Sequence, residues 1–194
     1  GQGTSVWIIT DPHQMAAVGE YVAEGNAAQL QDAYWRAELV EWVRFNEKEA
    51  RRSGDGLYAP ATGNPEVPRA LGELAMRFGL SSNAQNEKDL ARLRSSAGLA
   101  LFVSDRDDAP HWIEAGRCYE RFALQATVLG IRNAFLNQPI EVPHLRAQFA
   151  SWLGLGDKRA DLIVRFGYGP DMPRSPRRPL ERVVERWEPE PGAH

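Results

Sequence analysis

The sequence predicts a globular fold of the α+β or α/β class, with three or four strands covered by helices. Predicted helices outnumber predicted strands, and the strands are separated by helices along the chain. The composition is ordinary for a globular protein, with 43% hydrophobic and 25% charged residues in a chain of 194. This length is enough for one substantial domain with a real core.

Charge and special residues exclude several classes of function. The net charge is −3, without a basic face along the chain, which argues against nucleic acid as the main partner. No apolar run approaches the roughly 20 residues of a membrane span, and no signal peptide is visible, so a cytoplasmic protein is expected. The single cysteine, Cys118, rules out an intrachain disulfide, and the histidines lack metal-ligand spacing.

The first quarter of the chain predicts one strand and two helices. Residues 5–10 are apolar and rich in β-formers, which is typical of a buried strand. Asp11 can cap the helix that follows, and we expect this helix to break at Gly25. Asn26 is then expected to cap a longer helix over 27–52, whose broad apolar face predicts contacts on two sides.

A glycine- and proline-rich loop is predicted over 53–67, and a loop of this length inside a compact domain is usually functional or disordered. It can form a lid over a pocket, with Tyr58 facing a substrate, or it can be a simple exposed excursion. A helix over 68–78, a polar linker over 81–86 and a short charged helix over 87–94 are expected next.

The centre of the chain predicts a buried strand and a long helix. Residues 96–104 are nearly continuous in apolar residues, which predicts the central strand. A helix is expected over 110–128, with Gly130 as its left-handed cap, followed by a strand over 131–136. The stripe expected to face inward comprises Ile113, Gly116, Tyr119, Glu120, Ala123, Leu124, Thr127 and Val128.

Amides follow this second strand, since Asn137 and Gln138 come directly after Phe135 and Leu136. A helix with small residues, a glycine stop and an apolar strand that ends in amides suggests a flat ligand lying over the end of the strand. The alternative is a core helix followed by an ordinary loop, which these residues alone favour.

The end of the chain predicts a helix starting at Val142 and Pro143, and a last strand over 160–168. We therefore expect a lobe over 1–169 and an extended, proline-rich arm over 170–194. A helical turn or two is expected near 180–187.

Several short motifs resemble the flavin-dependent nitroreductase family. They are Trp112 and Gly116 followed by Leu129-Gly130-Ile131, the strand ending RFGYG, and the run PRSPRRP. The segments FLNQPIEVPHLR and RFGYGPDMPRSPRRPLE are most similar to the two-lobed Acg-like branch, to whose carboxy-terminal part the chain corresponds. The resemblance implies a nitroreductase-like α+β fold with a central mixed or antiparallel sheet of about four strands, incomplete at the amino terminus.

The resemblance also implies FMN, bound at an interface between lobes or in a dimer. Arg177 and Arg178 match the basic residues that meet the FMN phosphate, with Arg174 as a weaker candidate; the alternative is a solvated arginine run. The residues expected over the isoalloxazine are Phe135, Leu136, Asn137 and Gln138. A second alignment, on Pro139-Ile140-Glu141, borders the ring as well.

The activity implied is hydride transfer from NAD(P)H, through FMN, to nitro compounds or quinones, and it needs no catalytic side chain from the protein. An arginine and a serine that precede the first strand in the family have no counterpart here, so a partner or further residues are expected to complete the site. The alternatives are a flavin-binding or flavin-sequestering protein without turnover and a flavin-free interaction lobe of a pseudo-dimer.

Overall fold

The computed structural model describes residues 3–79 and 81–184, which form two compact units. The first unit holds residues 3–36 and 81–170, and the second holds residues 37–79 and 171–184. The predicted division into a lobe and an arm stays a prediction. Among the described residues, no helix is both long and apolar enough to cross a membrane.

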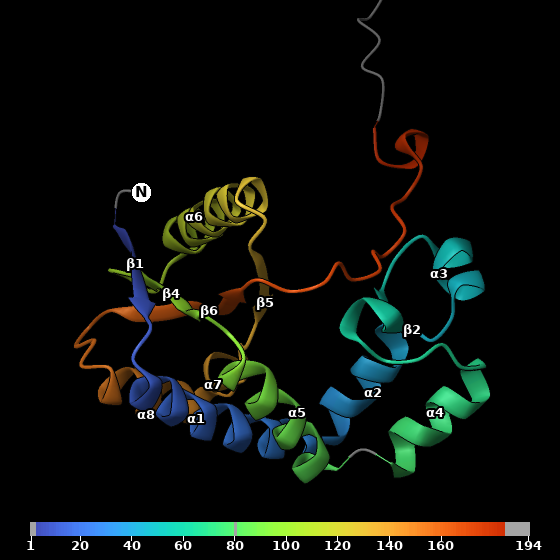
Figure 1. The fold of residues 1–194 in the computed structure, drawn as a ribbon, viewed down its shortest axis with the longest axis horizontal. Coiled ribbons are helices and arrows are strands. Elements are labelled where there is room, and N and C mark those ends of the chain that lie inside the picture. Colours follow the sequence, from blue (N-terminus) through green and yellow to red (C-terminus); the bar gives the residue numbers. More distant parts are fainter. Residues whose placement is uncertain (1–2, 80, 185–194) are drawn as a thin grey trace, which may run out of the picture. The chain divides into compact units, whose positions relative to one another are not determined.

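The first unit is built on a four-stranded antiparallel sheet (Figure 1), which confirms the predicted α+β class. The strands are β1 (Thr4–Ile9), β4 (Gly98–Ser104), β5 (Arg132–Phe135) and β6 (Arg159–Gly167), in the order β1-β4-β6-β5. All residues of β4 are buried, as its continuous apolar sequence predicts for a strand covered on both faces.

Helices cover both faces of this sheet. On one face lie α1 (Pro12–Gln31), α7 (Gln138–Glu141) and α8 (Pro143–Trp152), whose apolar residues pack with Leu99, Leu101 and Ile163. On the other face lies α6 (Ala109–Val128) (Figure 1). Phe102 packs there edge-on against Tyr119 and Phe122 of α6. A fifth helix, α5 (Ser82–Arg94), runs beside α1.

The second unit combines an excursion of the chain with its C-terminal arm. It contains β2 (Val43–Arg44), α3 (Glu47–Ser53), β3 (Leu57–Tyr58), the 3-10 turn η1 (Ala59–Thr62), α4 (Arg69–Phe78) and the 3-10 turn η2 (Leu180–Arg182). The strands β2 and β3 pair in parallel. The helix α2 (Ala33–Trp42) runs from the first unit into the second and has no buried residue.

The predicted helix break at Gly25 is wrong. α1 continues through Gly25 and Asn26, both buried, and ends at Asp32, whose Oδ1 accepts hydrogen bonds from the N–H groups of Tyr34 (2.8 Å) and Trp35 (3.3 Å). Gly25 does not end α1. It lies inside the helix, where the absence of a side chain makes room for Gln138. The predicted 27–52 helix is accordingly divided among α1, α2 and α3.

Two further expectations are corrected. Residues 82–86 belong to the start of α5 and are not a linker. One of their polar side chains, Asn86, accepts a hydrogen bond from Asn26 of α1. The inward stripe of α6 consists of Ala115, Cys118 and Ala126, with Tyr119 and Phe122 half-buried. Residues of the predicted stripe are exposed instead: Ile113 (59%), Leu124 (63%) and Val128 (79%).

Two predicted helix ends are confirmed. Asp11 caps α1 by accepting the Gln14 N–H at 2.9 Å, and Gly130 follows α6 with φ +70°. The loop expected over 53–67 contains β3 and η1. These two short elements were not predicted, because the glycines and prolines around them are typical of a loop. The part of the last predicted turn beyond residue 184 lies outside the described residues.

Candidate functional site

The end of β5 brings the predicted ring-facing residues together in the first unit. Phe135 is half-exposed (47%), and its ring centroid lies 4.7 Å from that of Tyr119. Leu136 is buried, and its N–H donates to the carbonyl of Ile163 at 2.9 Å, which extends the pairing of β5 with β6. The Phe135 ring can therefore meet a ligand, whereas the Leu136 side chain belongs to the core.

Asn137 ends the strand pairing and starts α7. Its side-chain Oδ1 accepts the Ile163 N–H at 3.0 Å, and its carbonyl accepts the N–H groups of Ile140 (2.8 Å) and Glu141 (2.9 Å). Among the hydrogen bonds of the described residues, none has the main-chain N–H of Asn137 or Gln138 as its donor. Pro139 has no N–H to offer and is fully buried. Two adjacent main-chain donors are thus left at the end of β5.

The side chain of Gln138 belongs to a buried polar network. Its Nε2 donates to Asn26 Oδ1 at 3.1 Å, and Asn26 Nδ2 donates to Asn86 Oδ1 and Asp89 Oδ2, each at 3.0 Å. Asn26 and Asp89 are each only 5% exposed. Gln138 Oε1 is buried without a hydrogen-bond partner among the described residues.

This network was missed because Asn26 was interpreted as a helix cap. The sequence does contain a signal for it. Asn26 and Gln29 follow Val18 and Val22 at helical spacing, so they continue the buried stripe of α1 with polar side chains. Buried polar side chains need partners, and such partners then define a specific place in the fold.

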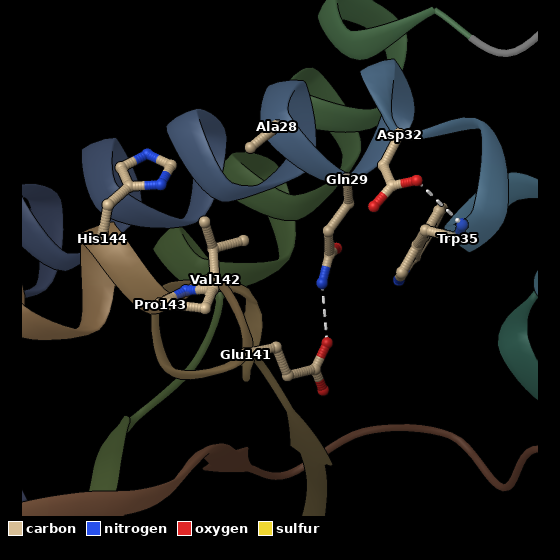
Figure 2. Close-up of a pocket in the computed structure, with 8 residues that line it drawn as sticks. All are labelled: Ala28, Gln29, Asp32, Trp35, Glu141, Val142, Pro143 and His144. Carbon is tan, nitrogen blue, oxygen red and sulfur yellow. Dashed lines mark hydrogen bonds between the residues drawn. The ribbon is translucent and has the colours of Figure 1, made fainter.

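A groove of about 300 Å³ lies at the other end of α7 (Figure 2). It is lined by Ala28, Gln29, Asp32, Trp35, Glu141, Val142, Pro143 and His144. Gln29 points toward Glu141, and its Nε2 donates to Glu141 Oε2 at 2.6 Å (Figure 2). Of the residues in the two alignments, only Glu141 of the second alignment lines this groove.

Tyr58 lies in the second unit, in β3. Its hydroxyl donates to Glu66 Oε1 at 2.7 Å, and this hydrogen bond is the main reason that the pKa of Tyr58 is raised to about 12. Its main-chain N–H donates to Ser175 Oγ of the C-terminal arm at 3.3 Å. Tyr58 is therefore a neutral phenol near pH 7, and its role toward a substrate stays a prediction.

The arginines of the arm differ in their surroundings. Arg178 Nε donates to the carbonyl of Gly54 at 3.2 Å, close to Asp55, whose pKa is lowered chiefly by its hydrogen bond with Arg44. Arg174 and Arg177 are exposed. Arg178, which is also exposed, thus helps to hold the arm to its own unit.

Comparisons with solved structures find FMN-dependent nitroreductases. The chain resembles the FMN-dependent nitroreductase NfnB from Mycobacterium smegmatis, in complex with NADPH, with a TM-score of 0.57 and 14% identity, covering 96% of this chain and 80% of that one. It resembles the FMN- and NADPH-dependent nitroreductase NfnB from sphigopyxis sp. strain HMH with a TM-score of 0.53 and 15% identity, covering 96% and 81%.

A third similar structure is a nitroreductase with bound FMN from Desulfitobacterium hafniense DCB-2, with a TM-score of 0.52 and 13% identity, covering 96% and 77%. No protein-family model matches the chain, and no curated protein matches it. At these identities the likeness concerns the fold, which is of the nitroreductase type.

Proposed function

We propose that this chain, which has the nitroreductase-type fold, binds FMN. We propose that it is an NAD(P)H-dependent oxidoreductase acting on nitro compounds or quinones, or the carboxy-terminal part of one. The observation that carries the proposal is the pair of main-chain donors at Asn137 and Gln138, beside the half-exposed ring of Phe135. A flat heteroaromatic ring suits this combination, since it stacks on an aromatic side chain and accepts hydrogen bonds at its edge. The proposed ring-binding segment comprises Phe135, Leu136, Asn137, Gln138 and Pro139, and its proposed contacts are the Phe135 ring and the N–H groups of Asn137 and Gln138.

When bound, FMN would supply the redox chemistry, taking a hydride from NAD(P)H and giving it to the acceptor. The chain's own contribution is to bind and orient the ring. Fixed N–H groups stabilise negative charge that develops at a ring edge, because their dipoles are already oriented. Asn137 and Gln138 are proposed for this task, which requires no acid or base from a side chain.

The arginines of the arm are proposed to bind the FMN phosphate. A guanidinium group donates paired hydrogen bonds to phosphate oxygens and stays charged at any physiological pH. Arg174 and Arg177 are exposed, so their donors are accessible to a ligand. Arg178 already donates from Nε to Gly54, which leaves its terminal nitrogens for the phosphate.

A second lobe or a second copy of the chain is proposed as a partner, as is a cytoplasmic location. The support for a partner is the exposed apolar face of α6, since large apolar side chains gathered on one helix often mark an interface. The exposed residues on this face are Ile113, Leu124 and Val128.

A flavin-binding protein without turnover is the second candidate. The observation that favours it is the attachment of the 54–58 segment to the C-terminal arm through Ser175 and Arg178. The second candidate adds the proposal that this fixed loop excludes nicotinamide from a bound flavin.

The test compares FMN with riboflavin, which has the same ring but no phosphate. Titration of the purified full protein is expected to show FMN binding. Phe135→Ala is expected to weaken both ligands, whereas Arg177→Ala weakens only FMN, and Arg182→Ala serves as the exposed control from the same unit. Absence of FMN binding would refute the proposal. Bleaching of the bound flavin by NADPH without oxygen distinguishes the enzyme from the second candidate.

A further inference from the structure

We infer that Asn26 and Asp89 are positioning residues that hold Gln138, and with it the start of α7, in one orientation toward a bound flavin ring. This inference rests on the proposed function. It concerns two residues, of α1 and α5, to which neither the sequence motifs nor the nitroreductase resemblance gave a role in binding. The argument has three steps, which concern the direction of the hydrogen bonds, the packing of α1 on Gln138, and the fixing of α7 at both ends.

Asp89 sets the direction of the hydrogen bonds. A carboxylate only accepts, so Asn26 presents its NH₂ group to Asp89 and turns its Oδ1 the other way. Oδ1 in turn requires a donor, which is the NH₂ group of Gln138 at 3.1 Å. Gln85 Nε2 donates to the same Asp89 oxygen at 2.9 Å, and Arg92 Nη1 lies 3.5 Å from the other. The acid therefore fixes which way both amides point.

The backbone of α1 reinforces this constraint. A Cβ atom on Gly25 would lie 2.6 Å from the Cβ of Gln138 and 2.9 Å from its carbonyl carbon. Such distances mean that α1 lies directly against the main chain of Gln138. A shift of Gln138 toward α1 is blocked by contact, and a shift away breaks its bond to Asn26.

α7 is held by α1 at both ends, because Gln29 also donates to Glu141 at 2.6 Å. Pro139 and Ile140, between these ends, are buried. The peptide groups that carry the free N–H donors of Asn137 and Gln138 therefore have little room to turn. The network itself is one donor short, since Gln138 Oε1 has no partner among the described residues.

The experiment uses the full-length protein and three variants. Asp89→Asn keeps the shape of the side chain but lets both amides flip, and Asn26→Ala removes the link altogether. Val22→Ala is the control, since Val22 is also buried in α1, at 2% exposure, but lies outside the network. The readouts are the dissociation constant of FMN, its reduction potential, the melting temperature, and hydrogen exchange of the Ile140 and Glu141 N–H groups without FMN.

Both network variants are expected to bind FMN about tenfold more weakly and to exchange Ile140 and Glu141 faster. Their flavin potential is expected to become more negative, because misdirected N–H groups stabilise the reduced ring less. A tenfold larger loss for reduced than for oxidised FMN corresponds to about 30 mV in a two-electron couple. Val22→Ala is expected to lower the melting temperature and to leave the potential unchanged.

An unchanged potential in both network variants would overturn the inference. An equal shift in Val22→Ala would do the same, because general loosening of α1 would then be the cause. If the wild-type protein binds no FMN, the proposed function fails and the flavin role of the network fails with it. Hydrogen exchange then still decides whether Asn26 and Asp89 hold α7, since it requires no flavin.

Discussion

Replacing Gly25 by alanine tests whether α1 packs directly on Gln138. A Gly→Ala change inside a helix normally stabilises the protein by about 0.5–1 kcal/mol, because it reduces the freedom of the unfolded chain. At Gly25 the added methyl group would meet Gln138 at 2.6 Å, and the nearby carbonyl carbon at 2.9 Å belongs to the backbone, which cannot rotate away. Overpacking of this kind costs about 1–3 kcal/mol. We expect a net loss of up to about 2 kcal/mol.

Gly116→Ala is the matched control. Gly116 also lies inside a long helix, but a Cβ there meets nothing within 4 Å. This variant is expected to gain the full helix contribution, so the two variants should differ by about 1–3 kcal/mol in free energy of unfolding. For a protein of this size, that is a difference of several degrees in melting temperature.

Thermal unfolding followed by far-ultraviolet circular dichroism measures both variants against the wild type. The expected order of melting temperatures is Gly116→Ala, wild type, Gly25→Ala. If Gly25→Ala were stabilised as much as Gly116→Ala, α1 would not pack on Gln138. The arrangement of α1 and α7 described above would then be wrong.

Three other predictions concern the arm, a helix end and a buried acid. The double variant Arg177→Ala/Arg178→Ala is expected to weaken FMN binding by about 2–4 kcal/mol, and unchanged affinity in a fluorescence titration would reject these arginines as the phosphate site. Gly130→Val is expected to destabilise the fold by about 1–2 kcal/mol because Gly130 has φ +70°, while FMN affinity stays the same; a wild-type melting temperature would contradict this. Burial raises the pKa of Asp161 above its usual 3.8, so the stability that it contributes is present in acid and is lost as pH rises through the raised pKa. Between pH 4 and pH 8, the melting temperature of Asp161→Asn is therefore expected to rise relative to that of the wild type. A constant difference between the two melting temperatures would argue against the raised pKa.

The elements of the sheet were predictable because their signals are local. β4 is apolar up to its last residue, as is typical of a strand buried on both faces, and Asp11 and Gly130 mark helix ends through their own backbone preferences. The break at Gly25 was mispredicted because glycine has two uses that look alike in sequence. It ends helices, and it also permits close contact between helices. Only the presence of Gln138 against Gly25 decides between them, and that contact spans more than a hundred residues.

The face of α6 was mispredicted for a different reason. The helix has apolar residues on more than one side, so spacing alone does not say which stripe meets the sheet. Phe102 decides this by packing on Tyr119 and Phe122, which leaves Leu124 and Val128 exposed. The proposed site was accessible to sequence only in part. The amides after Phe135 predicted a ligand at the end of β5. The roles of Asn26 and Asp89 depend on tertiary contacts, which the sequence does not show.

The second unit has a consequence for building chimeric proteins. Its 54–58 segment is attached to Ser175 and Arg178, which lie more than a hundred residues further along the chain. A graft that replaced residues 37–79 alone would place a foreign excursion against the native tail and would lose both attachments. A graft meant to transfer this unit therefore needs two inserts, the excursion and the tail, from the same donor protein.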